Sequence, residues 1–440
     1  MWLSKINSTT DVLIRLKSSI CESFASKQHH VTIFFDLEKV YNTTWRYGIL
    51  KTIHQVGLRG ELPLFIKSFL SHRFFQVRVG NTLSDRKCQE EGVPQGSVLS
   101  VTLFALSING VSSLIPSDVL HTLFVDDLSI SFSGSRMTTI ERKLQLTVNS
   151  ITNWADANGF KFSTSKTVIV HFCRVRGLHP DPDIYLYGKR ISCVQQTRFL
   201  GLTFDSKLNW VSHLKELKAR CLKTLDILRA LSHTTWGADR KHMLILYKAL
   251  VASKLAYGCE VYSSATEARL KVLDAVHNAG IRIASGAFKS SPITSMLVDA
   301  GELPLVLVRQ SLLIKYWYRV QRLPNSLTAR EVLSRQCFTY FDRHSKCPKP
   351  FSYRVQKILG DIDVPNNTVL NFKLSPIPPW KLPEVEYCDC LKGFKSDFND
   401  DEIKQIFLEH LECHLHSNFI FTDGSKSTTG VRVWSIKPSF

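Results

Sequence analysis

The chain has 440 residues, 44% of them hydrophobic and 21% charged, and at roughly 150 residues per domain this length predicts about three structural units. The composition excludes a disordered, collagen-like or fibrous protein. There are 56 Lys and Arg residues against 38 Asp and Glu, a formal net charge of +18. That excess favours a polyanionic partner such as nucleic acid or an anionic membrane face.

The cysteines and the N-terminal segment bear on location. The eleven cysteines are scattered and include no CxxC pair, so a reducing compartment is expected rather than a disulfide framework or a zinc ribbon. The N-terminal segment lacks a continuous apolar core, and no run of about 18 apolar residues occurs. We expect an intracellular chain, cytoplasmic or nuclear, that is neither secreted nor membrane-spanning.

The first elements alternate between helix and strand. Apolar residues at helical spacing after a Ser/Thr/Asp cluster predict a helix over about 10–27. The continuous apolar run at 31–37 predicts a buried central strand that ends at Asp36. A second helix is expected at about 45–56.

A loop and a hairpin follow. Gly92, Pro94 and Gly96 lie in a loop that opens an apolar helix within 92–111. Two strand-like runs, 119–125 and 128–132, are separated only by Asp126 and Asp127, which predicts a hairpin with the acidic pair at its turn.

The next helix is expected at about 139–158. Thr138 and Glu141 have capping-box spacing at its start, and Gly159 follows its end. Short strands follow up to about residue 205, and from Trp210 to about 340 the pattern is predominantly helical.

Charge and proline content divide the chain further. Residues 206–290 carry fourteen Lys or Arg against six Asp or Glu, whereas 361–415 carry five Lys against eleven Asp or Glu together with several prolines. We therefore predict a mixed helix and strand unit at 1–205, a helical unit at 206–345, an acidic Pro-rich connector at 346–416 and a short terminal segment at 417–440.

The acidic residues at strand ends indicate the chemistry. Asp36 and the Asp126–Asp127 pair lie 90 residues apart, each at the end of an apolar strand. Carboxylates there are costly to desolvate unless they bind a cation, and several converging at a sheet edge would suit Mg²⁺. We expect Asp126 to be the direct ligand, with Asp127 beside it. Taken singly, each could also be a solvated turn or strand-end aspartate.

Five segments together resemble a known family. The sequences FFDLEKVY, GVPQGSVLS, FVDD, FSTSKTVIVHF and FLGLTFDSKLNW resemble, in order, motifs A to E of the reverse transcriptases of non-LTR retrotransposons, most similarly the jockey-like group. The resemblance covers roughly residues 1–210, and the helical stretch to about 320 resembles the region after the polymerase core in those elements. It implies an α+β fold: a right-hand polymerase palm, made of an antiparallel sheet with helices, plus a helical thumb and extension.

The resemblance also implies roles for individual residues. Two Mg²⁺ ions, for which Mn²⁺ can substitute, would be held by Asp36, Leu37, Asp126 and Asp127. Tyr41 would stack under the incoming sugar and reject a 2′-hydroxyl. Gln95 and Gly96 would contact the template and nucleotide, with glycine permitting close backbone approach.

Two further motifs imply contacts with phosphate and primer. Lys166 would donate a proton to pyrophosphate or hold the triphosphate. Phe199, Leu200 and Gly201 would grip the primer end. The plain alternatives are a core tyrosine at Tyr41, turn formers in the glycine loop, a solvated lysine and apolar core residues.

Some positions depart from the family pattern. Asn42 replaces a common aspartate, Val101 a usual proline and Val125 a frequent alanine. The family's fingers region begins upstream of this sequence, and an upstream endonuclease domain is absent from it, so the chain resembles an internal piece of a longer polyprotein.

The C-terminal segment resembles the first strand of a ribonuclease H domain. Asp423 in NFIFTDGSKSTTG would be its first metal-binding carboxylate, but no acidic residue follows it in this sequence. Because that chemistry needs three or four carboxylates, we expect no nuclease activity from this segment. A metal site at Cys388, Cys390, Cys413 and His416 is disfavoured because their spacing is not that of a zinc finger.

The leading functional hypothesis is an RNA-directed DNA polymerase, with an RNA template, a DNA primer and deoxynucleoside triphosphates as partners. The second is an inactive remnant that only binds nucleic acid, through basic helices after residue 206. The third is another two-metal enzyme on a palm-like fold, such as a nucleotide cyclase or nuclease, against which Tyr41 and the Gln95 loop argue. The sequence leaves the oligomeric state open.

Overall fold

The computed structural model describes residues 8–362, except 39, 178, 234, 323–331 and 335–336, together with 402, 405, 408, 409 and the strands 421–427 and 430–436. The chain divides into two compact units, Met1–Phe372 and Lys373–Phe440. The site residues expected in the polymerase motifs all lie in the first unit.

A five-stranded sheet is the centre of the first unit, with strand order β11-β8-β1-β7-β6. Strand β1 pairs antiparallel with both β7 and β8, and β6 pairs antiparallel with β7. The short edge strand β11 runs parallel to β8, so the expected antiparallel sheet is in fact mixed. The cause is the long connection between β8 and β11, which carries the chain back to the same edge. The strands are β1 (His29–Phe35), β6 (Leu120–Phe124), β7 (Asp127–Gly134), β8 (Val168–Phe172) and β11 (Ser192–Cys193).

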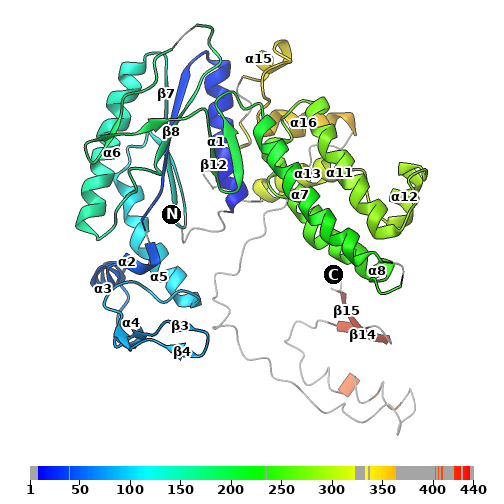
Figure 1. Cartoon of the computed structure of the whole chain (residues 1–440), viewed down its shortest axis with the longest axis horizontal. Helices are drawn as coiled ribbons and strands as arrows, with labels where there is room; N and C mark the ends of the chain where they lie inside the picture. Colours follow the sequence, from blue (N-terminus) through cyan, green and yellow to red (C-terminus); the bar gives the residue numbers. More distant parts are fainter. Residues whose placement is uncertain are drawn as a thin grey trace. The chain divides into compact units, whose positions relative to one another are not determined.

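Helices cover both faces of this sheet, α1 (Thr9–Ala25) one face and α6 (Met137–Ala157) the other (Figure 1). Alternate residues of β1 pack into different cores: Ile33 joins the core that contains α6, whereas Phe34 joins the core that contains α1. A strand buried on both faces needs apolar side chains at successive positions. The predicted buried central strand is therefore confirmed.

The start of α6 differs from the sequence expectation. Its N-cap is Arg136, and no side chain caps the helix. Because the helix begins at Met137, Thr138 already lies inside the first turn, and the expected capping box does not form. The Glu141 carboxylate instead accepts a hydrogen bond from the backbone N–H of Asp183 at 2.9 Å.

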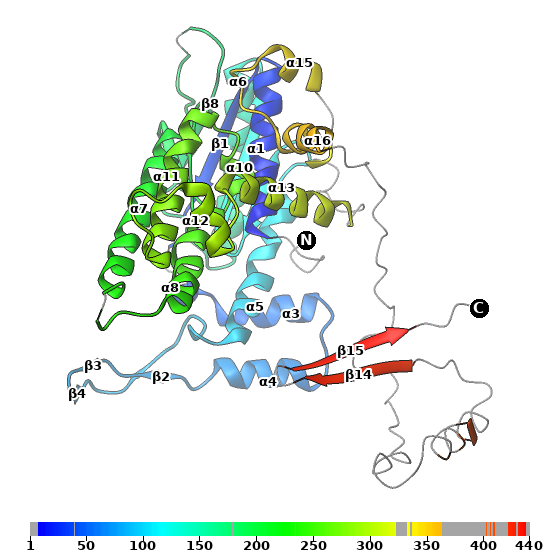
Figure 2. The same ribbon diagram turned by 90° about the vertical axis from the view of Figure 1, so that its right-hand side faces the viewer.

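A smaller helical lobe follows β1 and has a core of its own, which includes Ile49, Ile66 and Leu103. A long hairpin, residues 74–88, extends from this lobe beyond α4 (Figure 2). The elements are α2 (Val40–Thr43), α3 (Arg46–Gln55), α4 (Glu61–Leu70), β2 (Phe74–Phe75), β3 (Arg78–Val79), β4 (Thr82–Leu83), β5 (Lys87–Cys88), α5 (Val98–Ile108) and the 3₁₀ segment η1 (Asn109–Leu114).

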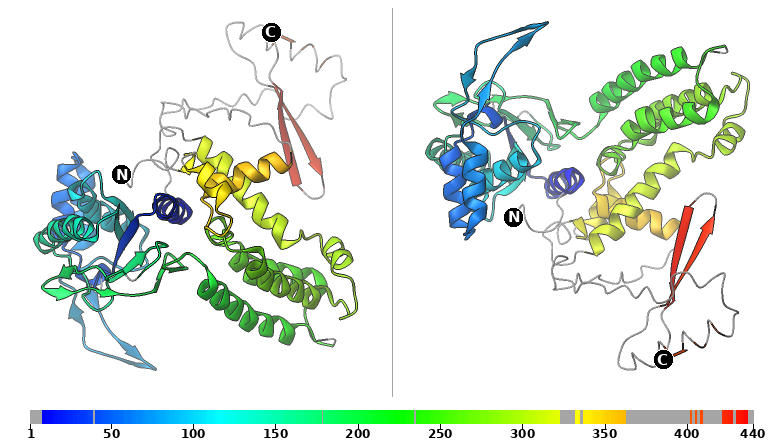
Figure 3. Two further views of the ribbon diagram at one scale, coloured as in Figure 1. Left: turned by 90° about the horizontal axis from the view of Figure 1, so that it is seen from above. Right: turned by 90° about the horizontal axis from the view of Figure 1, so that it is seen from below.

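The described residues between 211 and 361 are predominantly helical, as predicted from 210 to about 340, and form a bundle beside α1 (Figure 3). Two hairpins precede it, β9 (Tyr185–Leu186) with β10 (Lys189–Arg190) and β12 (Gln196–Phe199) with β13 (Leu202–Asp205). The helices are α7 (Val211–Leu231), α8 (Arg240–Tyr247), the π-helical η2 (Lys248–Ala252), α9 (Ser253–Ala256), α10 (Cys259–Tyr262), α11 (Glu267–Ser285), α12 (Ile293–Ala300), α13 (Leu305–Gln321), α15 (Phe338–Arg343) and α16 (Phe351–Asp361).

The boundary expected at 345 lies too early. Helix α16 belongs to the segment predicted as a connector, yet its residues Phe351, Val355 and Leu359 are buried in the same core as α13. The packed region therefore continues to the end of α16. The rest of the connector up to 401, and the Cys388, Cys390, Cys413 and His416 group, lie outside the described residues.

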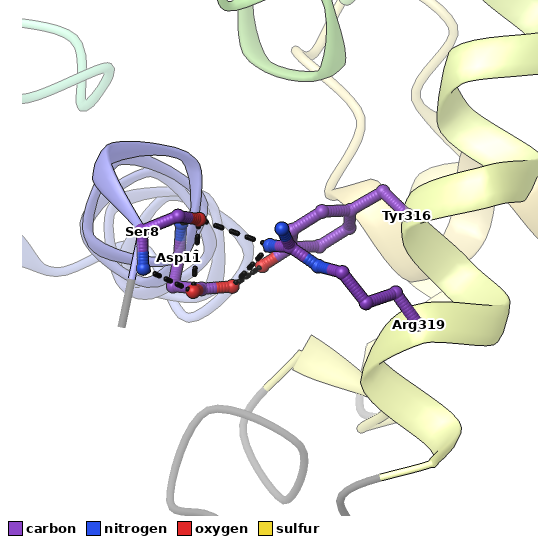
Figure 4. Close-up of polar contacts among 4 residues, drawn as sticks. All are labelled: Ser8, Asp11, Tyr316 and Arg319. Carbon is purple, nitrogen blue, oxygen red and sulfur yellow. Dashed lines mark hydrogen bonds and ion pairs between the residues drawn. The ribbon is translucent and has the colours of Figure 1, made fainter. Parts of the chain in front are cut away.

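Helix α1 joins the sheet to the bundle. Its buried face shares one core with the bundle, and its first turn makes a polar cluster with α13 (Figure 4). The Asp11 carboxylate Oδ1 accepts hydrogen bonds from the Tyr316 hydroxyl at 2.6 Å and from Arg319 Nη2 at 3.0 Å. Its other oxygen accepts from the Ser8 backbone N–H, which completes a capping box at the start of α1. The sheet and the bundle are thus packed as one body.

The second unit is described at its two strands, β14 (Phe421–Ser427) and β15 (Gly430–Ile436), which pair antiparallel. Asp423 lies on β14 opposite Trp434. Among the described residues of the whole chain, no helix has the length and apolarity needed to cross a bilayer.

Candidate active site

The turn between β6 and β7 carries the acidic pair. Phe124 pairs with Asp127, so Val125 and Asp126 form the two-residue turn and Asp127 is the first residue of β7. The predicted hairpin is present, but its turn lies one residue earlier than the Asp126–Asp127 turn that the sequence predicted. Val125 has φ of +56°, a conformation that costs an L-residue about 1–2 kcal/mol and is rare for β-branched side chains. Such backbone strain clusters at functional sites, where surrounding structure maintains it.

The pairing of β1 with β7 brings Asp36 to the same place. Phe35 is opposite Leu128, and continuing this register puts Asp36 opposite Asp127. Directly opposed residues in antiparallel strands have their side chains on the same face, with Cα atoms about 4.5–5.5 Å apart. The three carboxylates that the sequence proposed as metal ligands therefore meet at one end of the sheet.

The electrostatics of this end reflect that convergence. The pKa of Asp127 is raised to about 6, first by burial and then by the negative charges of Asp126 and Asp36. The Asp36 Oδ2 atom is secluded from solvent and accepts no hydrogen bond, although the Lys166 ammonium lies 3.5 Å from it. Carboxylates that repel one another and include an oxygen without a hydrogen bond fit a hard divalent cation such as Mg²⁺, which prefers oxygen ligands.

Backbone pairing fixes Asp36 in position. Its carbonyl accepts from the Ser163 N–H at 2.8 Å, and its own N–H donates to Thr167 Oγ1 at 3.3 Å. Leu37 forms an isolated bridge with Phe162, but the bonds on either side of that bridge do not use the Leu37 carbonyl. That carbonyl remains able to serve as an oxygen ligand.

Lys166 lies beside the carboxylates. Its Nζ is 3.5 Å from Asp36 Oδ2, and its side chain is 71% exposed. An ion pair with so exposed a lysine is worth little and exchanges readily with other anions. The ammonium can therefore leave Asp36 for a phosphate group.

Tyr41 lies on α2, with its ring centroid 5.4 Å from that of Phe104. It is half-buried, and its pKa is raised by burial and then by the charge of Asp126. The side chain is thus at the edge of the acidic group rather than deep in the core, although it packs against core residues.

The glycine loop is fixed against Tyr41. Gly92 has φ of +78°, and a Cβ there would lie 2.5 Å from the Tyr41 carbonyl oxygen. The exposed Gln95 donates through Nε2 to Asn42 Oδ1 at 3.4 Å, so the residue that departs from the family pattern orients Gln95. Gly96 is also exposed and has φ of +90°, a conformation that favours glycine.

Sequence reasoning missed the residue that anchors this loop. Arg46 donates from Nε to the Gly92 carbonyl at 2.9 Å and from Nη2 to the Glu91 carbonyl at 3.1 Å. Thr167, which holds the Asp36 N–H, was also missed. Arg46 opens α3 with no motif around it, so the sequence offered no signal to separate it from a solvated arginine.

The predicted primer-grip residues lie at the β12–β13 turn. Leu200 and Gly201 have φ of 44° and 82°, as in a type I′ hairpin. The Tyr257 hydroxyl donates to the Leu200 carbonyl at 2.8 Å. Phe199 is 3% exposed and its ring packs 4.9 Å from that of Phe34, so Phe199 is a core residue and only the turn itself is half-exposed.

Comparison with known proteins identifies the first part of the chain. Residues 3–204 match the family model described as reverse transcriptase (RNA-dependent DNA polymerase). The chain contains a reverse transcriptase domain.

This reverse transcriptase domain has relatives in mobile elements. The RNA-directed DNA polymerase from the mobile element jockey of Drosophila melanogaster is 26% identical over 334 residues, which are 73% of this chain and 36% of that protein. The probable RNA-directed DNA polymerase from transposon BS of the same species is 26% identical over 291 residues, 63% of this chain and 31% of that protein. The chain therefore spans about a third of the length of these curated relatives.

Among solved structures, apo telomerase from Candida tropicalis is 15% identical, covers 73% of this chain and 55% of that chain, and superposes with a TM-score of 0.37. Telomerase from Candida albicans in complex with an RNA fragment covers 74% of this chain and 54% of that chain at 12% identity, with a TM-score of 0.32. Scores of this size are too low to establish a shared fold.

The bundle beside the reverse transcriptase domain exposes several basic side chains. Several of its cations are neutralised internally, as in the pairs of Arg240 with Asp299 and of Lys248 with Glu302. Helix α7 instead exposes a group of four cations with no ion pair among the described residues: Lys215, Lys218, Arg220 and Lys223. Helix α7 thus carries part of the predicted excess of positive charge.

Proposed function

We propose that this chain is the polymerase part of a non-LTR retrotransposon and extends a DNA primer along an RNA template. The meeting of Asp36, Asp126 and Asp127 at one sheet edge, where Asp36 Oδ2 accepts no hydrogen bond, is the observation that carries the proposal. In this reaction the primer 3′-hydroxyl attacks the α-phosphate of a deoxynucleoside triphosphate and pyrophosphate leaves.

The acidic residues would hold two Mg²⁺ ions, or Mn²⁺ in their place. Bound there, the ions would activate the attacking hydroxyl and stabilise the leaving pyrophosphate. Asp36 and Asp126 are the direct carboxylate ligands in this proposal, and Asp127 and the Leu37 carbonyl lie next to them. Burial and then the charges of Asp126 and Asp36 raise the pKa of Asp127, and binding the cations would relieve the second of these causes.

Neighbouring residues would orient the substrates. Lys166 would exchange Asp36 for the triphosphate and give a proton to pyrophosphate as it leaves. Tyr41, fixed between Phe104 and the glycine loop, would lie under the sugar and exclude a 2′-hydroxyl. Gln95 and Gly96 are exposed residues of the same loop and would contact the base pair.

The fold in this proposal is a polymerase palm with a helical thumb. The four unpaired cations of α7 would contact backbone phosphates of the template–primer duplex, which gives salt-dependent binding without base specificity. The half-exposed Leu200–Gly201 turn would approach the primer. In the second unit, the β14–β15 hairpin would be the start of a ribonuclease H fold with Asp423 on its first strand.

The names of the relatives support these substrates. Both Drosophila proteins are described as RNA-directed DNA polymerases of transposable elements. RNA template, DNA primer and deoxynucleoside triphosphates are therefore the partners to test.

The test is extension of a labelled DNA primer on an RNA template in Mg²⁺. We expect the wild-type chain to extend the primer and Asp126→Asn to lose extension while keeping its circular dichroism spectrum. Asp118→Asn is the matched control, because Asp118 is an exposed aspartate paired with Lys143 rather than with the acidic group. Equal extension by Asp126→Asn and Asp118→Asn would overturn the assignment of Asp126.

Other results would point to the remaining hypotheses. Salt-sensitive binding to the duplex with no extension in either Mg²⁺ or Mn²⁺ would identify a remnant that only binds nucleic acid. Cleavage of nucleic acid or cyclisation of a nucleotide without primer and template would identify a different two-metal enzyme.

A further inference from the structure

A second cluster of metal-binding residue types lies at the opposite end of β1. His29 is the first residue of β1 and Cys173 directly follows β8. Because His30 pairs with Phe172, the antiparallel register places His29 opposite Cys173. His179, on the segment after β8, completes a group whose three ligand atoms all lie within 4.8 Å of one another.

The rings of this cluster are already held in place. His29 Nδ1 lies 2.9 Å from His171 Nε2, so Nε2 is the nitrogen through which His29 would bind a metal. His179 donates through Nε2 to the Val175 carbonyl at 3.3 Å. Nδ1 is therefore the nitrogen through which His179 would bind a metal. A metal-binding histidine commonly makes such an outer hydrogen bond through its second nitrogen, because that bond fixes the tautomer and the ring orientation.

We propose that His29, Cys173 and His179 bind one Zn²⁺ ion, with His171 positioning His29. Two imidazole nitrogens and one thiolate sulfur are the donors that Zn²⁺ takes in tetrahedral sites, and a water can supply the fourth. On binding, the thiol proton of Cys173 is released to solvent.

The spacing needs little adjustment. Zinc–nitrogen and zinc–sulfur bonds of the usual lengths put tetrahedral ligand atoms about 3.3–3.6 Å apart. The present separations, at most 4.8 Å, require a movement of about 1 Å. Cys173 and His179 are half-buried, so an ion can enter from solvent.

This site is separate from the acidic group. Strand β1 spans seven residues from His29 to Phe35, and at about 3.3 Å per residue this length separates the two groups by about 20 Å. A bound ion here would link the segment after β8 to the edge of the sheet, where the chain turns back toward β11. Its role would be structural, and its soft ligands would not compete for Mg²⁺.

The experiment measures zinc retained by the whole purified chain after dialysis, and the spectrum of the Co²⁺-loaded form. Because Cys388, Cys390, Cys413 and His416 could bind zinc independently, all variants are made in a Cys388→Ser/Cys390→Ser background. We expect about one zinc per chain and a thiolate-to-cobalt charge-transfer band. Cys173→Ser and His179→Gln should each weaken zinc binding at least about tenfold and, for Cys173→Ser, abolish the band.

Two variants serve as matched controls. Cys88 and His54 are an exposed cysteine and an exposed histidine outside the cluster, so Cys88→Ser and His54→Gln should retain zinc as the parent does. If Cys173→Ser fails to fold, His179→Gln still tests the site, since His179 lies on a surface segment. Zinc far below one per chain in the parent, or equal retention by Cys173→Ser and Cys88→Ser, would overturn the proposal.

Discussion

At one end of β1, Asp36 lies opposite Asp127 and beside Asp126, whereas at the other end His29 lies opposite Cys173 and near His179. The first group consists of hard, charged oxygen ligands whose mutual repulsion contributes to a pKa of about 6 for Asp127. The second consists of soft or borderline nitrogen and sulfur ligands held by hydrogen bonds to neighbouring groups.

The two kinds of ligand suit two different roles, a catalytic site at one end of β1 and a structural metal site at the other. Repelling carboxylates store unfavourable energy that a divalent cation and a substrate can release, which suits a reacting site. Imidazoles fixed by outer hydrogen bonds suit an ion that stays bound and holds chain segments together. The same central strand thus connects a proposed catalytic end to a proposed structural end.

The largest expected effect comes from one variant at each end of β1, which tests whether the two ends have separate roles. Asp36→Asn is expected to reduce primer extension roughly a thousandfold or more, because it removes a metal ligand from the transition state, while changing the melting temperature little. His179→Ala is expected to leave extension within about twofold, because sites so far apart act nearly independently, and to abolish stabilisation by added zinc.

The measurements are single-turnover extension and thermal unfolding with and without zinc. A loss of extension in His179→Ala as large as that in Asp36→Asn would show that the two ends are not functionally separate.

A glycine-to-alanine pair tests the loop next to the acidic end. In Gly92→Ala the new Cβ would lie 2.5 Å from the Tyr41 carbonyl, so the loop must move and the free energy of unfolding should fall by about 2–3 kcal/mol. Gly96→Ala is the control, since its Cβ meets nothing within 4 Å and only the positive φ costs about 1 kcal/mol. Urea unfolding of both variants measures the difference, and equal losses would show that crowding at Tyr41 is unimportant.

The acidic end could be predicted from sequence because its parts are local. The apolar run to Asp36 and the two strand-like runs around Asp126 each predict a strand. Antiparallel pairing of these strands then brings the three carboxylates together. Motif order supplied the roles of Tyr41 and Gln95, which remain predictions. The same reasoning placed Phe199 among nucleic-acid contacts, although its ring is buried against Phe34.

Other features depended on contacts between distant segments. The zinc cluster joins His29 to His179, which lie 150 positions apart in the sequence, with no motif spacing to reveal it. Arg46 donates to the backbone carbonyls of Gly92 and Glu91. Because every residue has a backbone carbonyl, no sequence pattern marks these acceptors. The capping box at Thr138 was wrong because the helix starts two residues earlier than expected, a shift that local patterns do not resolve.

The cluster between α1 and α13 allows a test of how firmly the sheet and bundle are joined. Tyr316→Phe removes the buried hydroxyl that donates to Asp11, and the free energy of unfolding should fall by about 1–2 kcal/mol. Tyr318→Phe, on the same helix, is the control because the Tyr318 hydroxyl makes no hydrogen bond among the described residues. Chemical unfolding followed by fluorescence measures both. An equal effect of the two variants would show that the Asp11 contact adds nothing to stability.

The smallest effect concerns Asp127 and depends on pH. Its folded pKa of about 6 lies above the ordinary value of 3.8, so ionisation is disfavoured in the folded chain. The resulting cost is absent below about pH 4, grows between pH 4 and 6, and is fully present above that range. In metal-free buffer, Asp127→Asn should therefore raise the free energy of unfolding at pH 7 by about 1 kcal/mol after solvent screening, with no gain at pH 4.

Added Mg²⁺ should reduce that advantage, because the cation stabilises the ionised wild-type group but not the amide. Urea unfolding at both pH values, with and without Mg²⁺, separates these effects. An advantage of Asp127→Asn that is equal at pH 4 and pH 7 would mean that carboxylate repulsion is not its source. That result would contradict the proposed difference between the two ends of β1, namely that electrostatic repulsion destabilises the acidic end and not the histidine end.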